Sequence, residues 1–242
     1  MRLARLTALA ATAVVAIAWS ATASAASDER LQTALDKLVE IKGGPPGVGV
    51  VLVRGHRETF LRAGVADVET DKPFTRRKHM RIASVSKAFS GAVALSLVDR
   101  GLLSLDDTIG ARLPALPAAW GSVTLRQLLS HTGGVSNYTE DEGFQQYFGD
   151  HLQDDITLLG LIDFVRDEPL EFAPGTGYRY SNTDNIIIAL MAEAVTGTPY
   201  VDLLKREVAR PLDLRQTALP RGVNVPKPLI SGYTTRCPRS RT

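Results

Sequence analysis

Two segments with the character of β-strands, in close succession, constrain the fold of this chain more than any other feature. GVGVVLVRG at residues 47–55 has the continuous apolar character of a buried strand, and ETFLRAGVAD at 58–67 is suited to be its hairpin partner. The sequence RGHR at 54–57 supplies the turn between them. Elsewhere the apolar residues recur with helical spacing, so the sequence predicts one hairpin followed by a long helical region.

Glycine and proline punctuate the segments that have helical spacing. We expect helices over residues 28–42, from Ser84 to Gly101, and over 124–131, 155–169, 183–197 and 200–212. Gly133-Gly134 is expected to close the helix at 124–131. No repeat or low-complexity linker separates these segments, so the chain suits one large domain or two interleaved ones.

The first 25 residues have the pattern of a secretory signal peptide. Two arginines precede an apolar run over residues 6–19, and the sequence ASA at 23–25 resembles a cleavage site. The alternative is an uncleaved membrane anchor, although the run is short for a membrane span. We expect cleavage after Ala25, a secreted or extracytoplasmic protein, and no membrane association after cleavage.

Composition excludes several classes of function. The chain has 28 Lys and Arg against 26 Asp and Glu, scattered along its length, so we expect no nucleic-acid partner. A hydrophobic fraction of 44% is enough for a packed core. Cys237 is the only cysteine, so an exported chain has no internal disulfide. His56, His79 and His151 have no partners at metal-binding spacing, and we expect neither a metal nor another cofactor.

Two short motifs carry candidate chemistry. Ser84 and Lys87 begin the helix expected to end at Gly101, and their spacing puts them on one helical face, where a lysine can activate a serine nucleophile. Tyr180 could pass a proton to a leaving group, and Asn182 could hold a substrate amide. The alternatives are a serine N-cap with a solvated lysine, and an aromatic turn before a polar helix cap.

With both motifs in place, the chain resembles the serine β-lactamase-like hydrolases, the penicillin-recognising family of class C β-lactamases and secreted D-alanyl-D-alanine carboxypeptidases. The resemblance runs from about Leu31 to Tyr233 and is carried by FTRRKHMRIASVSKAFSGAVALSLVDRGLLSLDDTI, VTLRQLLSHTGGVSNY and PGTGYRYSNTDNIIIALMAEAVTGTPYVDLL. It implies an α+β fold, in which an antiparallel sheet is flanked by helices and an all-helical subdomain is inserted.

The resemblance also implies a role for each motif residue. Ser84 is the acyl-accepting nucleophile, and its backbone N–H is one oxyanion donor. Lys87 takes or relays the proton of Ser84. Tyr180 is the general base or acid for the leaving group, and Asn182 holds the amide of the substrate.

The third motif of the family, a Lys- or His-Thr-Gly that faces the nucleophile, is not found where the resemblance predicts it. His131-Thr132-Gly133 has the right letters but precedes the Tyr180 motif, so we expect it to be a helix-ending loop in which His131 binds its own loop. The tail TTRCPRSRT at 234–242 matches nothing in the family. We therefore expect a partial domain over 26–233, an atypical tail at 234–242, and a chain that lacks the C-terminal strands of the family.

The implied function is exported serine hydrolysis through an acyl-enzyme, of the D-alanyl-D-alanine carboxypeptidase or D-peptidase type. Its substrate would be a small peptide or a β-lactam-like acyl compound, with peptidoglycan as a further candidate partner. The alternatives are a β-lactamase or small-ester hydrolase of the same family, or an inactive remnant that binds cell-wall peptide. Because the missing strands would supply an oxyanion donor, we expect the 242-residue chain to be inactive by itself and poorly stable.

Export is directly testable. If the signal peptide is cleaved as expected, N-terminal sequencing of secreted protein should give a chain that starts at Ala26. Recovery of a chain that starts at Met1 in the membrane fraction would instead support the uncleaved anchor.

Overall fold

The computed structural model describes residues 26–220, 222 and 224–233, which divide into two compact units. Residues 26–80 and 226–233 form the sheet unit, and the residues between them form the helical unit, which is therefore an insertion in the order of the chain. The predicted signal peptide at 1–25 and the tail at 234–242 lie outside the described residues.

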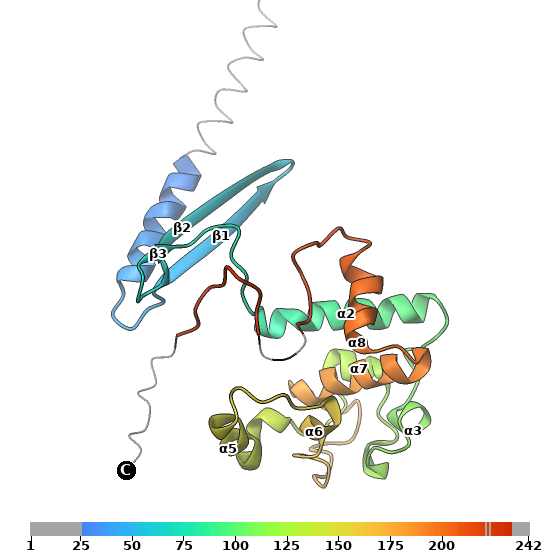
Figure 1. The fold of residues 1–242 in the computed structure, drawn as a ribbon. Helices are drawn as coiled ribbons and strands as arrows, with labels where there is room; N and C mark the ends of the chain where they lie inside the picture. Colours follow the sequence, from blue (N-terminus) through green and yellow to red (C-terminus); the bar gives the residue numbers. More distant parts are fainter. Residues whose placement is uncertain (1–25, 221, 223, 234–242) are drawn as a thin grey trace, which may run out of the picture. The chain divides into compact units, whose positions relative to one another are not determined.

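The sheet unit contains the predicted hairpin, but its first strand is not buried as predicted: Val51 and Val53 are 53% and 69% exposed. β1 (Gly47–Arg54) pairs antiparallel with β2 (Arg57–Asp67), and a short β3 (Lys72–Pro73) completes a sheet of order β1-β2-β3. A helix over residues 26–40 lies beside the hairpin (Figure 1) and is tied to it where the Gln32 side chain donates to the Arg62 carbonyl. Among the described residues β1 has a strand partner on one side only.

The helical unit contains two long helices, α2 and α7, and several short helices joined by loops (Figure 1). Its α-helices are α2 (Ser86–Asp99), α3 (Ile109–Arg112), α4 (Leu125–Ser130), α5 (Glu142–Asp150), α6 (Leu158–Ile162), α7 (Asn182–Thr196) and α8 (Tyr200–Leu204). Three 3-10 turns, η1 (Ala83–Val85), η2 (Ala118–Trp120) and η3 (Tyr138–Glu140), and one π turn, η4 (Lys205–Ala209), complete it. The sheet and the helices together confirm the predicted α+β class.

Several predicted helices need correction. The prediction over residues 155–169 is wrong beyond α6, which ends at Ile162. Pro169 disfavours helical backbone at the residue before it, and residues 163–167 form turns instead. The single helix predicted over 200–212 is instead the short helix α8 followed by the π turn η4, which ends at Ala209. The helix α5 was not predicted, because its glycines and glutamines obscure the apolar positions.

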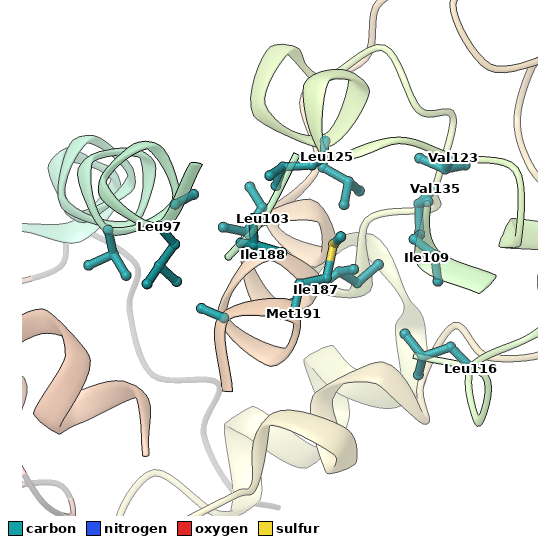
Figure 2. Packing of buried hydrophobic residues seen from close by; sticks show 14 of the residues in the cluster. Leu97, Leu103, Ile109, Leu116, Val123, Leu125, Val135, Ile187, Ile188 and Met191 are labelled. Carbon is teal, nitrogen blue, oxygen red and sulfur yellow. The ribbon is translucent and has the colours of Figure 1, made fainter. Parts of the chain in front are cut away.

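The core of the helical unit is built around α7. Figure 2 shows Ile187, Ile188 and Met191 of this helix in the middle of the cluster, with Leu97 of α2 on one side and Ile109 of α3 on the other. These side chains are at most 4% exposed. The helices α2 and α4 both pack against α7, which brings segments far apart in the sequence together.

No single helix within 26–220, 222 and 224–233 is long and apolar enough to cross a membrane. The segments Asn182–Thr196 and Tyr200–Ala209 pass the same test only as a pair, and they are bent by 89° at their junction.

Two leucines on α2 offer a matched test of this core. Leu97 is fully buried and Leu95 is 51% exposed, although both lie on the same helix. Leu97→Ala should lower the free energy of unfolding by about 2–5 kcal/mol, because it leaves a cavity in the cluster. Leu95→Ala should change it by about 0.5 kcal/mol or less. Urea unfolding of both variants measures the difference, and equal effects would contradict this assignment of the core.

Candidate active site

Ser84 lies in a strained turn directly before α2. It is the middle residue of the 3-10 turn η1, which continues into α2 at Ser86. The preceding residue, Ala83, has φ +45°, a left-handed conformation that is unfavourable for alanine. Strained backbone of this kind is concentrated at functional sites. The caps of η1 and α2 are Ile82 and Val85, so the alternative interpretation of Ser84 as an N-cap does not describe this turn.

Tyr180 brings the two residues of the first motif together. Its hydroxyl donates a hydrogen bond of 2.8 Å to the Ser84 Oγ. The Lys87 Nζ lies over the same aromatic ring, 4.7 Å from its centroid. The spacing of Ser84 and Lys87 suggested a direct contact, but no direct hydrogen bond between them is found in the described part of the chain. The phenol stands between them instead.

Asn182 fixes the position of Lys87. It is the first residue of α7, and its Oδ1 accepts a 2.7 Å hydrogen bond from the Lys87 Nζ. Its Nδ2 donates to the Asn137 Oδ1 at 3.2 Å and to the Thr139 Oγ1 at 3.0 Å. The amide of Asn182 is therefore engaged at both ends within the protein. Its predicted contact with a substrate stays a prediction, and the structure adds a contact with Lys87.

Asn137 is a site residue that sequence reasoning missed. Its side chain is nearly buried, and its Oδ1 accepts hydrogen bonds from both the backbone N–H and the side-chain Nδ2 of Asn182. Its Nδ2 donates to the Glu140 Oε1 at 3.0 Å. Asn137 thus orients the residue that orients Lys87. Only its place soon after the LLSHTGG block could have pointed to it.

The environment of Tyr180 lowers the pKa of its phenol. Burial opposes ionisation, but hydrogen bonds with Lys87 and Ser84 and the Lys87 charge outweigh burial, so the pKa of Tyr180 lies below its ordinary value. The pKa of nearby Tyr138 moves the other way, because burial and the proximity of Tyr180 both raise it. The arrangement therefore favours Tyr180 as the phenol that can hold a negative charge beside a lysine.

His131 does not bind its own loop as predicted. It ends α4 with a left-handed φ of 56°, a role that the sequence analysis gave to Gly133-Gly134. Its Nδ1 lies 2.8 Å from the Oδ2 of Asp184, a residue in the first turn of α7. The ring therefore joins two helices, because the left-handed backbone turns it away from its own loop.

The described residues show no group of three or more His, Cys, Asp or Glu side chains that could hold a metal ion. His151 also has a carboxylate partner, because its Nδ1 lies 2.7 Å from the Oδ2 of Asp154. Both side chains are largely exposed at the end of α5.

The Beta-lactamase family profile matches residues 28–242. The chain belongs to the Beta-lactamase family. Penicillin-binding protein 4* of Bacillus subtilis (strain 168) is 28% identical over 157 residues, which is 64% of this chain and 33% of that protein. Esterase EstB of Burkholderia gladioli is 34% identical over 181 residues, which is 69% of this chain and 45% of the esterase.

Similarity to solved structures supports the same assignment. A D-stereospecific amidohydrolase from Streptomyces sp. matches with a TM-score of 0.72 and 30% identity, over 82% of this chain and 58% of that one. The resemblance and the β-lactamase/transpeptidase-like fold that were predicted from the motifs are thereby confirmed. The chain spans less than half the length of the two curated relatives and about three fifths of the solved amidohydrolase.

The buried carboxyl of Asp184 predicts a pH-dependent stability. Burial raises its pKa from 3.8 to about 6, although the hydrogen bond and charge of His131 oppose the increase; Glu171 adds to it, and Lys87 lowers it. The folded state thus binds this proton more tightly than the unfolded chain. The free energy of unfolding should therefore fall as the pH rises from about 4 to about 6.

Asp184→Asn removes this cost while keeping the size of the side chain. The stability of the variant relative to wild type should increase between pH 4 and pH 7.5. The difference in the free energy of unfolding should grow by up to about 3 kcal/mol, and melting temperatures measured at both pH values report it. Asp154→Asn, at the exposed His151 pair, is the matched control and should show no such change. A difference for Asp184→Asn that is the same at both pH values would contradict the prediction.

Proposed function

We propose that this chain carries the nucleophile of a serine hydrolase that works through an acyl-enzyme on Ser84. The observation that carries the proposal is the 2.8 Å hydrogen bond between Tyr180 and the Ser84 Oγ. Lys87, held by Asn182, lies against the same phenol and favours its ionised form. Nucleophilic catalysis requires a nucleophile in contact with a group that can accept its proton. A third group in turn orients the proton acceptor.

The contacts support a relay in which Tyr180 is the immediate proton acceptor. The 2.8 Å contact also serves when Tyr180 is ionised and Ser84 is the donor. As the Ser84 Oγ bonds to the acyl carbon, its proton moves to the Tyr180 oxygen, and the Lys87 ammonium stabilises the phenolate beforehand. When the bond to the leaving group breaks, Tyr180 returns the proton to that group. Water then attacks the acyl carbon and releases Ser84.

We propose an acyl-D-amino-acid peptide as the substrate, in a reaction of the D-alanyl-D-alanine carboxypeptidase or D-peptidase type. The names of two similar proteins, a penicillin-binding protein and a D-stereospecific amidohydrolase, support this choice. Secretion, and cell-wall peptide as the natural source of the substrate, belong to the same proposal. They are supported by the pattern of residues 1–25 alone.

Hydrolysis of a small ester is the second candidate. The 34% identity to an esterase favours it, and the first step on Ser84 would be the same for an ester, a peptide or a β-lactam. In a longer protein that carries these residues together with the third motif of the family, release of D-alanine from an acylated D-Ala-D-Ala peptide, compared with its L-Ala-L-Ala counterpart and with a p-nitrophenyl ester, separates the two candidates. Hydrolysis of the ester with no preference for the D-peptide would favour the esterase.

Covalent labelling tests the nucleophile itself. A fluorophosphonate reacts with an activated serine without requiring a complete substrate pocket, so it suits the full chain. Ser84→Ala should abolish labelling, as read by intact mass, whereas the exposed neighbour variant Ser86→Ala should label like wild type. Tyr180→Phe should slow labelling by about 10²–10⁴-fold, the usual scale of general acid–base catalysis. Lys87→Ala should slow it by at least about tenfold, because the phenolate loses its counter-charge.

Two outcomes would contradict the proposal. Undiminished labelling of Ser84→Ala would remove Ser84 from the role of nucleophile. Absence of labelling in a wild-type chain that shows a cooperative thermal transition would favour the alternative of a non-catalytic protein that only binds its ligand.

A further inference from the structure

His131 and Asp184 form a buried pair that the proposed reaction does not use. The side chain of Asp184 is 1% exposed and that of His131 is 16% exposed, and the contact between Nδ1 and Oδ2 measures 2.8 Å. The other carboxylate oxygen, Oδ1, has no hydrogen-bond partner within the described residues. A buried carboxylate with one unpaired oxygen is costly, so a fold that keeps it suggests a purpose beyond packing.

The pair is in direct contact with Tyr180. The rings of His131 and Tyr180 are tilted by 45° with their centroids 4.7 Å apart. The backbone carbonyl of His131 also accepts a 3.0 Å hydrogen bond from the Arg179 N–H, so the segment that carries Tyr180 is attached to His131 by main chain and by side chain. The Ser181 N–H approaches the same Nδ1 at 3.4 Å. The shorter contact with the carboxylate identifies Nδ1–H as the donor to Asp184, so this approach adds proximity rather than a second bond.

His131 and Lys87 also line one small cavity. Its volume is about 30 Å³, and Asn185 and apolar residues of α4 and α7 complete the lining. That space is enough for a water molecule with polar partners. The imidazole therefore contacts the buried carboxylate and the Tyr180 ring directly, and it shares a cavity with Lys87.

We propose that His131, anchored by Asp184, is a positioning residue for Tyr180, which holds the phenol against Ser84 and makes acylation depend on the charge state of the buried pair. This inference rests on the proposed function of Ser84 as the nucleophile. The alternative is that the pair only joins α4 to α7. The two alternatives differ in whether loss of the ring or of the charge changes the reaction in a protein that is still folded.

The backbone of His131 permits a clean removal of its ring. Asparagine tolerates the left-handed conformation better than most residues, so His131→Asn should keep the end of α4 intact. Because a displacement of about 1 Å can cost 10²-fold in rate, the rate constant for labelling of Ser84 should fall about 10- to 100-fold. The concentration of fluorophosphonate that gives half of the maximal labelling rate should change by no more than about twofold.

His151→Asn is the matched control for this variant. It breaks a His–Asp contact of the same kind, 2.7 Å long, at the exposed end of α5. Its labelling rate should equal that of wild type. Thermal unfolding of both variants shows whether the fold is kept.

A pH profile separates a positioning role from a purely structural one. Asp184→Asn keeps the size of the side chain and an oxygen that can accept from Nδ1–H, but it removes the charge. The wild-type carboxyl loses its charge below about pH 6, so the ratio of the wild-type rate to the variant rate should be about tenfold or more at pH 7.5 and near one at pH 5. Lys87 and Tyr138 also face Tyr180, and Glu171 faces the pair, but these groups are the same in both proteins.

The results decide between the two roles. A rate for His131→Asn equal to that of His151→Asn, or a ratio for Asp184→Asn that does not vary with pH, would overturn the inference while Ser84 is still labelled in wild type. If His131→Asn fails to fold, the pH dependence of Asp184→Asn decides alone. Wild-type protein with no labelled Ser84 would instead refute the proposed function.

Discussion

The packing of α2 against α7 is the constraint on which the candidate site depends. Ser84 lies in η1 directly before α2, Lys87 lies in the first turn of α2, and Asn182 is the first residue of α7, so the contact between these helices brings the two motifs together. The apolar residues that make the contact, such as Leu97 and Met191, lie further along both helices and have no chemical role. Their burial supplies the free energy that holds charged and strained groups in place at the helix starts.

The sequence predicted which side chains come together better than it predicted the contacts among them. Ser84, Lys87, Tyr180 and Asn182 were candidates by residue type and spacing and received their roles from the family resemblance, and the structure brings all of them together. Spacing along one helix could not show that a phenol from a distant segment would stand between serine and lysine. The sequence did not predict the role of Asn137 or the pairing of His131 with Asp184 for the same reason. These contacts join residues that are 45 and 53 positions apart. The fold followed the same rule: the long periodic helices, the hairpin and the capped helix α4 were predictable, whereas α3, α5 and the end of α6 were not.

Left-handed backbone flanks the site on two sides. Ala83 precedes the nucleophile with φ +45°, and His131 ends α4 with φ +56°. The cost is larger for alanine than for histidine, which is among the residues that adopt this conformation more readily. Each turn gives a side chain a direction that a continuous helix would not allow: the hydroxyl of Ser84 is exposed beside Tyr180, and the ring of His131 turns toward α7. Strain and orientation are thus two aspects of the same local geometry.

The charges of Lys87 and Asp184 in the helical unit do not pair with each other but have other neighbours. Lys87 has the neutral oxygen of Asn182 and the face of a phenol as its neighbours, so its positive charge is only partly compensated. Asp184 is a buried carboxylate close to the site, but it is paired with His131 rather than with the lysine. Because Lys87 is hydrogen-bonded to Asn182 and lies over the Tyr180 ring, its charge acts on the phenol, where it can stabilise a phenolate next to Ser84.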